Sequence, residues 1–152
     1  SDNPAAPEAT PPVLGFTAPP RVEPNLAGRG AVVSATAGPR VSRATAATLL
    51  TATGGSAAFT ARFDVQPWIV RYRTPGVDGA LVTASGAVYL PVAASGALPV
   101  LVYQHGTVYD RNAVPSNLAS QEGQVFGTAY GTDGFAAVLP DYVGLGTSDA
   151  PY

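Results

Sequence analysis

The spacing of apolar residues changes character several times along the chain. Residues 1–27 show neither a helical nor a strand period and are rich in Pro and Ala. Proline lacks a backbone donor and disfavours helix at the preceding residue, so we expect this segment to be an extended arm on the surface. A helix is predicted next, with its N-cap at Ser42, running through Leu50 and stopped by Gly54 and Gly55.

A period of two follows the predicted helix. Apolar and polar residues alternate over residues 59–65 and again over residues 68–72. The apolar residues occupy odd positions in the first stretch and even positions in the second, so the alternation reverses across residues 66–67. We interpret the reversal as a bulge or bend in one long edge strand. A turn at 74–79 leads to a second alternating stretch, so the two stretches predict an antiparallel hairpin. Apolar residues on one face of the second stretch are Val82, Ala84, Val88 and Leu90.

Two continuous apolar runs complete the pattern. Residues 100–103 and 135–139 do not alternate, as is typical of parallel strands with helices on both faces. Between them, residues 118–130 predict a crossover helix, although two glycines weaken it. An antiparallel hairpin followed by a parallel β-α-β unit indicates the α/β class and the opening of an open sheet.

Composition excludes several classes of protein. The 152 residues carry a net charge of −2, and all eight basic residues are Arg. They offer no concentrated basic face for nucleic acid. Cys is absent and His occurs once, so this sequence cannot provide a disulfide, a catalytic thiolate or a multi-His metal site. Residues 79–109 are uncharged, but their prolines and glycines predict short strands and no membrane span.

The first residues of the sequence suit an exported protein. The sequence starts at Ser1 without Met, and its opening Ser-Asp-Asn-Pro-Ala-Ala-Pro is compatible with a mature chain after signal cleavage. A boundary chosen for expression would look the same. We favour a secreted or periplasmic location.

Two short motifs follow the continuous apolar runs. The first run leads into Gln-His-Gly-Thr at 104–107, and the second into an Asp-Tyr-x-Gly-x-Gly-x-Ser loop that starts at Asp141. Their order and spacing resemble the α/β-hydrolase superfamily, in particular its secreted lipase/esterase branch. The hairpin segments 69–74 and 84–91 look like the first hairpin of that branch, and the resemblance covers roughly residues 68–152.

The resemblance implies the N-terminal half of a serine carboxylic-ester hydrolase, with residues 28–152 as that half of the domain and no cofactor. Acyl transfer passes through an oxyanion that backbone N–H groups stabilise. In this superfamily the loop after the third strand supplies one such group. By position, that donor would be Thr107 or Val108. Residues implied as support for it are His105, Gly106, Asp141 and Tyr142.

Three residues invite assignment to a Ser-His-Asp triad. Ser148 stands in a Gly-x-Ser-x-Ala sequence, but a loop separates it from the last strand, whereas a nucleophile elbow follows its strand directly. The resemblance implies that His105 orients the oxyanion loop, because the triad His of the superfamily comes near the C-terminus, and a base needs a nucleophile within hydrogen-bond reach. We predict that Ser148, His105 and Asp141 have structural roles in their loops. Residues 110–112 either clamp the loop, line the acyl pocket or face solvent.

No Gly-x-Ser-x-Gly elbow occurs, and the Asp and His that the superfamily places after the elbow are missing as well, so these residues alone cannot assemble a triad. We expect the chain alone to be inactive, and its apolar strand at 100–103 to expose an open edge. The expected partner is the C-terminal half of the same hydrolase as a separate chain, after cleavage beyond Tyr152. A truncation or an unusual short homologue is the alternative.

The expected substrate of the combined halves is a carboxylic ester. Peptidases share the fold, so an aminopeptidase-like or prolyl-peptidase-like activity is an alternative. A second alternative is an exported binding or structural module that lacks a triad.

Overall fold

The computed structural model describes residues 27–151, so nearly all of the expected arm at 1–27 lies outside the described residues. One mixed sheet runs through the described part, with strand order β1-β2-β3-β5-β4. The elements in chain order are β1 (Val32–Ala37), α1 (Arg43–Ala52), a 3-10 turn (Gly55–Ala57), β2 (Val65–Pro75), β3 (Leu81–Pro91), β4 (Val100–Val102), a π-helical turn (Gly123–Gly127), α2 (Thr128–Asp133) and β5 (Ala136–Pro140).

The predicted hairpin and the predicted parallel unit are both present. Strands β2 and β3 pair antiparallel along their whole length, and β4 and β5 pair in parallel. Strand β3 also pairs antiparallel with β5, which joins the two units into one sheet. The α/β class and the order of antiparallel hairpin and parallel β-α-β are therefore confirmed.

Two expectations about β2, its start and its place at the edge of the sheet, are wrong, and the bulge considered for it is absent. Residues 59–64 form no strand, because the N–H groups of Arg62 and Phe63 donate to the carbonyl oxygen of Thr132 at the end of α2. Pairing runs through residues 66–67 without a bulge, and the register shift lies instead in β1. Strand β1 pairs with the outer side of β2, so β2 is not an edge strand.

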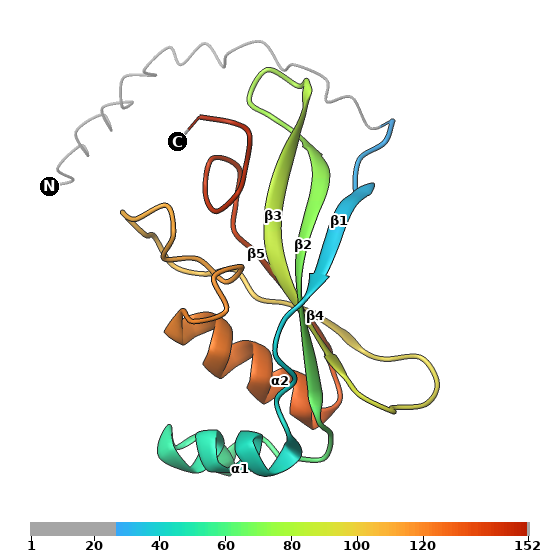
Figure 1. The fold of residues 1–152 in the computed structure, drawn as a ribbon, viewed down its shortest axis with the longest axis vertical. Helices are drawn as coiled ribbons and strands as arrows, with labels where there is room; N and C mark the ends of the chain where they lie inside the picture. Colours follow the sequence, from blue (N-terminus) through green and yellow to red (C-terminus); the bar gives the residue numbers. More distant parts are fainter. Residues whose placement is uncertain (1–26, 152) are drawn as a thin grey trace, which may run out of the picture.

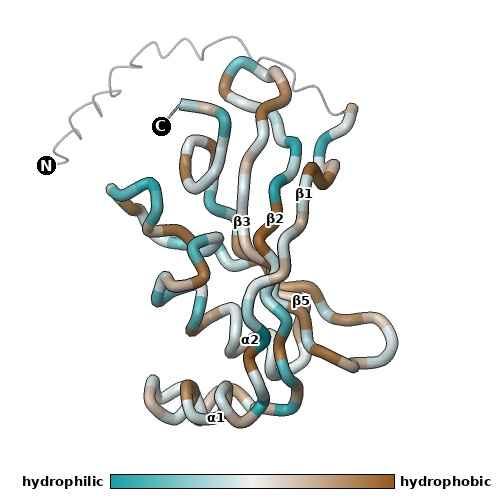
Figure 2. Tube along the Cα trace, in the orientation of Figure 1, coloured by the Kyte–Doolittle hydropathy of each residue, from teal (hydrophilic) through white to brown (hydrophobic). Residues whose placement is uncertain are grey.

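The core lies between β3, β5 and the helices, and hydrophobic stretches of the strands appear brown where the strands cross in Figure 2. On β3 the face opposite to Val82 and Val88 supplies it, through Ala87 and Tyr89. The core cluster consists of Val65, Ala87, Tyr89, Ala137 and Leu139.

The crossover segment is helical from residue 121 to residue 133, three residues later than predicted. Its glycines allow close packing on the sheet. A Cβ on Gly127 would lie 2.4 Å from the Tyr89 ring, and a Cβ on Gly131 would lie 2.8 Å from Val65. The glycines that weaken the helix by propensity are therefore the residues that let it approach the core.

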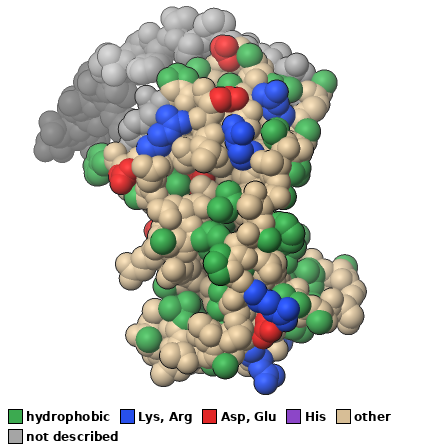
Figure 3. Space-filling model, in the orientation of Figure 1, with side chains coloured by type: hydrophobic (Ala, Val, Ile, Leu, Met, Phe, Trp, Pro, Cys, Tyr) green, Lys and Arg blue, Asp and Glu red, His purple; other side chains and the backbone are tan. Residues whose placement is uncertain are grey.

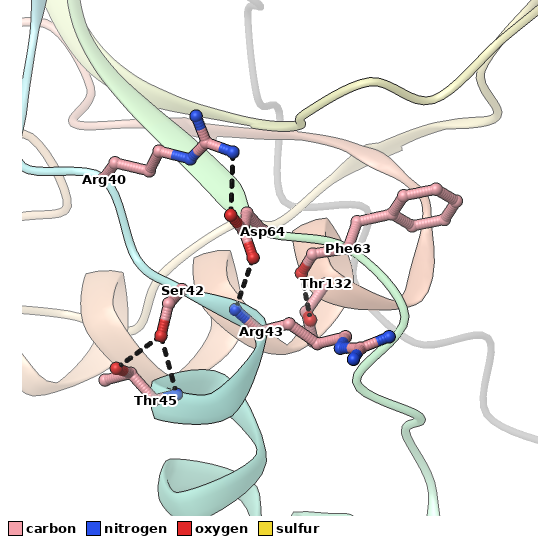
Figure 4. A network of polar contacts seen from close by, with 7 residues as sticks. All are labelled: Arg40, Ser42, Arg43, Thr45, Phe63, Asp64 and Thr132. Atoms are coloured by element: carbon pink, nitrogen blue, oxygen red, sulfur yellow. Dashed lines mark hydrogen bonds and ion pairs between the residues drawn. The ribbon is translucent and has the colours of Figure 1, made fainter.

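Helix α1 begins as predicted at Ser42, whose hydroxyl accepts the Thr45 N–H at 3.0 Å. Asp64, just before β2, ties this end of the helix to the sheet (Figure 4). Its carboxylate accepts the Arg43 N–H and the Arg40 guanidinium, each at 2.7 Å. The hydrogen bond from the Arg43 N–H, followed by that from Arg40, lowers the pKa of Asp64 below its ordinary value of 3.8.

This pKa shift predicts an acid-dependent contribution to stability. A carboxylate with a depressed pKa stabilises the fold above its unfolded pKa, and the contribution is lost as pH falls through the folded pKa. We expect Asp64→Asn to melt below the parent at neutral pH and the two melting temperatures to converge as pH falls through the folded pKa of Asp64. Thermal unfolding from neutral to acidic pH measures the difference, with Asp110→Asn as a loop control. A difference that persists undiminished in acid would contradict the assignment.

One edge of the sheet and parts of its surface stay apolar and exposed. Val100 and Val102 on β4 are 68% and 56% exposed, and within the described range β4 pairs with β5 alone. On the face seen in Figure 3, hydrophobic side chains form patches across the middle, while charged side chains gather toward the ends. An exposed apolar edge strand is unusual in a soluble domain, because its unpaired backbone groups can pair with another chain.

Candidate functional site

The two motif loops meet at one edge of the sheet because they follow neighbouring parallel strands, β4 and β5. His105 is 4% exposed and touches both loops. Its Nδ1 lies 2.7 Å from the carbonyl oxygen of Gly106, and its Nε2 lies 3.2 Å from that of Asp141. Both ring nitrogens therefore face backbone carbonyl oxygens, and among the described residues neither contacts a side-chain hydroxyl that could act as a nucleophile.

Tyr142 packs against the same turn. Its ring stacks on His105 with centroids 4.2 Å apart, and its hydroxyl donates to the His105 carbonyl at 2.7 Å. Tyr142 has φ of +72°, a left-handed conformation that costs a non-glycine residue about 1–3 kcal/mol. The stack and the hydrogen bond hold this backbone in place, and the strain marks the loop as a candidate functional site.

Asp141 is fully buried and joins three segments of the chain. Its carboxylate accepts the Ser85 hydroxyl of β3 at 2.6 Å and the Ser116 N–H at 2.9 Å. Ser85 in turn accepts the Thr147 N–H at 3.0 Å. Burial, and then the negative charge of Asp141, raise the pKa of Tyr72. The carboxylate is an internal tie between β3 and the loops after β4 and β5.

Ser85 and Ser116 were not among the residues predicted from the sequence. Each is buried, and each contacts Asp141 across a long sequence separation. The only signal for Ser85 was its place in β3, between Ala84 and Gly86, where a polar residue on a buried face needs a hydrogen-bond partner. No local pattern identifies Ser116.

Ser148 is 6% exposed and its hydroxyl donates to the Thr83 carbonyl oxygen at 2.9 Å. Asp149 beside it accepts the Thr83 N–H at 2.7 Å. This pair therefore fastens the last loop to β3. The hydroxyl is directed at the sheet and not at His105, so the geometry gives it no base.

Arg111 clamps the two motif loops together, which is one of the alternatives left open by the sequence. Its Nε donates to the Gly146 carbonyl oxygen at 3.0 Å, and its terminal amino group donates to the Ser148 carbonyl oxygen. The Gly146 N–H donates back to the Arg111 carbonyl oxygen at 2.9 Å. Asp110 accepts the Asn112 N–H at 2.9 Å and shapes the same loop.

An open hollow of about 420 Å³ lies beside the turn. Residues 106–108 form part of one wall, and Glu122 at the start of the crossover helix forms part of another. The Tyr103 hydroxyl at the end of β4 donates to the Glu122 carboxylate at 3.2 Å. Thr107 is exposed, and within residues 27–151 its N–H has no acceptor. The turn thus presents a backbone donor at the edge of a space that could admit a ligand.

The described residues contain no group of three or more His, Asp or Glu placed to hold a metal ion. Between residues 27 and 151, none of the helices has the length and hydrophobicity that crossing a membrane requires.

No protein-family model matches the sequence, and no curated protein matches it significantly. Solved structures that share the fold include a candidate hydrolase from Legionella pneumophila, with a TM-score of 0.70 and 35% identity over 78% of this chain. They also include the rice cell wall degrading esterase LipA from Xanthomonas oryzae, with a TM-score of 0.68 and 26% identity over 82% of this chain. In each comparison the chain spans 32% of the matched structure.

Proposed function

Because this chain folds as the N-terminal part of an α/β-hydrolase, we propose that it is the N-terminal portion of a serine carboxylic-ester hydrolase of the lipase or esterase type. The hydrolase-like fold and the esterase among its structural neighbours support this proposal. The proposed role of residues 28–152 is to supply the oxyanion-hole turn and part of the acyl pocket.

The observation that carries the proposal is the turn at residues 104–107. In ester hydrolysis a serine attacks the carbonyl carbon, and the carbonyl oxygen gains negative charge in the tetrahedral intermediate. A backbone N–H held in advance at that position stabilises the charge. The N–H of Thr107 or of Val108 would donate to it. Collapse of the intermediate expels the alcohol and leaves an acyl-enzyme, which water hydrolyses.

The contacts around the turn would hold the proposed backbone donor in place before the reaction. His105, Tyr142 and Arg111 connect the turn to the loop after β5, and Asp141 anchors that loop to β3. A donor held in this way needs no rearrangement when charge develops, and removing one such donor typically costs about 10²–10³ in kcat. We propose His105, Gly106, Asp141 and Tyr142 as positioning residues and not as members of a triad.

The remaining catalytic groups are proposed to lie outside these 152 residues. Strand β4 is short, apolar and exposed at its outer edge, where a further strand can pair. The solved structures that the chain matches are much longer than it, since it covers only 32% of each. We propose that the C-terminal portion of the same hydrolase packs on β4 and provides the serine, the acid and the base, as a second chain or as further sequence.

An exported location is part of the proposal. The structural neighbour from Xanthomonas oryzae is named for degrading rice cell wall, which is compatible with this location.

The proposal is tested by substrate preference in the protein that contains both portions. We expect hydrolysis of p-nitrophenyl esters, and loss of this activity on treatment with a fluorophosphonate, because that reagent traps an activated serine. Preferential cleavage of aminoacyl or prolyl p-nitroanilides would favour a peptidase. Neither hydrolysis nor reaction with the fluorophosphonate would indicate a module without a triad and would overturn the proposal.

A further inference from the structure

An open hollow of about 590 Å³ lies at the opposite end of the parallel strands from the turn at 104–107. The loop between β3 and β4, yellow in Figure 1, forms one side of it. Residues 97–99 and 134–135 in its wall precede β4 and β5, whereas the two motif loops follow these parallel strands. The hollow is therefore separate from the proposed oxyanion turn. Its volume is typical of small-molecule sites, which measure roughly 300–1,000 Å³.

A carboxylate oxygen at the wall of this hollow is buried without a hydrogen bond. Asp133, the last residue of α2, lines the hollow, and its side chain is 18% exposed. Its Oδ1 is buried, and no donor among residues 27–151 hydrogen-bonds to it. The Nε of Arg62 lies 3.3 Å away and forms an ion pair without hydrogen-bond geometry. Buried acceptors are almost always hydrogen-bonded, so this oxygen indicates a donor that the described residues do not supply.

Helix stability does not explain the position of Asp133. The C-terminal end of a helix carries partial negative charge, so a carboxylate in the last turn is unfavourable. The ion pair offsets little of this cost, because the Arg62 side chain is 60% exposed. Ala93, also in the wall, has φ of +60°, a left-handed conformation that is rare for residues with a side chain. Unfavourable local arrangements that gather at one place are typical of functional sites.

The rest of the wall is apolar and partly aromatic. Phe63, Leu98 and Phe135 line it, and all three are partly exposed. Phe63 packs over Gly134, where an added Cβ would lie 3.3 Å from its ring. Aromatic rings attract one another face to face with an offset or edge to face, so the two phenylalanines favour a ligand with an aromatic ring.

We infer that this hollow binds a small, uncharged aromatic amide. The amide N–H donates to Oδ1 of Asp133, and the amide oxygen accepts from the guanidinium of Arg62, which is exposed enough to turn toward it. Arg62 and Asp133 are the charged residues in the described wall, and their opposite charges favour a ligand without net charge. The inference is independent of the ester hydrolase proposal, because it uses neither the turn at 104–107 nor a catalytic serine.

The probe for this site is benzamide. Acetophenone is its matched control, because it has the same ring and carbonyl group but no N–H. In an NMR titration of the protein containing both portions, benzamide should bind saturably and about 10-fold more tightly than acetophenone. Asp133→Leu is close to Asp in shape and removes the acceptor. It should weaken benzamide binding about 10-fold and leave acetophenone binding unchanged.

A second variant covers the case in which Asp133→Leu does not fold. Ala97→Trp places a large side chain at an exposed position of the wall and should abolish the binding of both probes. Val77→Trp, at the exposed tip of the β2–β3 hairpin, is the control and should bind like the parent. Absence of saturable benzamide binding to the parent would overturn the inference, and so would equal affinities for benzamide and acetophenone. Undiminished benzamide binding to Asp133→Leu or Ala97→Trp would do the same.

Discussion

Replacing Thr107 by Pro is expected to lower kcat for ester hydrolysis about 10²- to 10³-fold, the usual cost of losing one oxyanion donor. Proline has no backbone N–H, so the substitution removes the proposed donor. Thr107→Ala is the matched control, since it removes the side chain and keeps the N–H. Its kcat should stay close to the parent value.

The measurement is steady-state hydrolysis of a p-nitrophenyl ester, with thermal unfolding to confirm that each variant is folded. Loss of an interaction made only in the transition state lowers kcat with little change in KM. The same pair of substitutions at Val108 distinguishes the two candidate donors. If the Pro variants at both positions keep the parent kcat, the turn does not bind the oxyanion.

Replacing Asp141 by Ala is expected to lower the free energy of unfolding by about 2–5 kcal/mol. The carboxylate is fully buried and accepts from the Ser85 hydroxyl and the Ser116 N–H. Each of these donors would be left buried without its present acceptor, at a cost of about 1–3 kcal/mol apiece. Asp141→Asn keeps an oxygen that can accept from Ser116, so it should cost less than the alanine variant.

Urea unfolding of the protein measures this effect, with Asp110→Ala as control. Asp110 is an exposed residue of a neighbouring loop whose carboxylate accepts one local N–H. Its replacement should change stability by no more than about 0.5 kcal/mol. Equal stability of Asp141→Ala and Asp110→Ala would show that the buried carboxylate does not hold the loops together. Reduced ester hydrolysis at full stability would instead indicate a direct catalytic role for Asp141.

Elements with strong local signals could be predicted from the sequence. The N-cap at Ser42 and the turn between β2 and β3 are encoded by residues within a few positions of one another. The unbroken apolar runs of β4 and β5 predicted a parallel pair, and that pairing brings the His105 and Asp141 loops together. Motif order along the chain thus carried information about proximity in space.

Other features depend on residues far apart in sequence. All six residues of β1 are exposed, so no apolar pattern marks it, and only pairing with β2 makes it a strand. The alternation over residues 59–64 reflects packing near the end of α2, where Thr132 bonds the backbone of Phe63. The Ser85 and Ser116 contacts to Asp141 are likewise set by tertiary structure, and local sequence patterns do not predict them.

The most direct test of this account is to locate the serine that reacts with a fluorophosphonate. The protein containing both portions is labelled, digested and mapped by peptide mass spectrometry. We predict a single labelled serine outside these 152 residues and none at Ser148, whose hydroxyl is buried and bonded to Thr83. A label on Ser148 or on any other serine of this sequence, or a protein that takes up no label, would contradict the assignment of the chain as the oxyanion-supplying portion of a serine hydrolase.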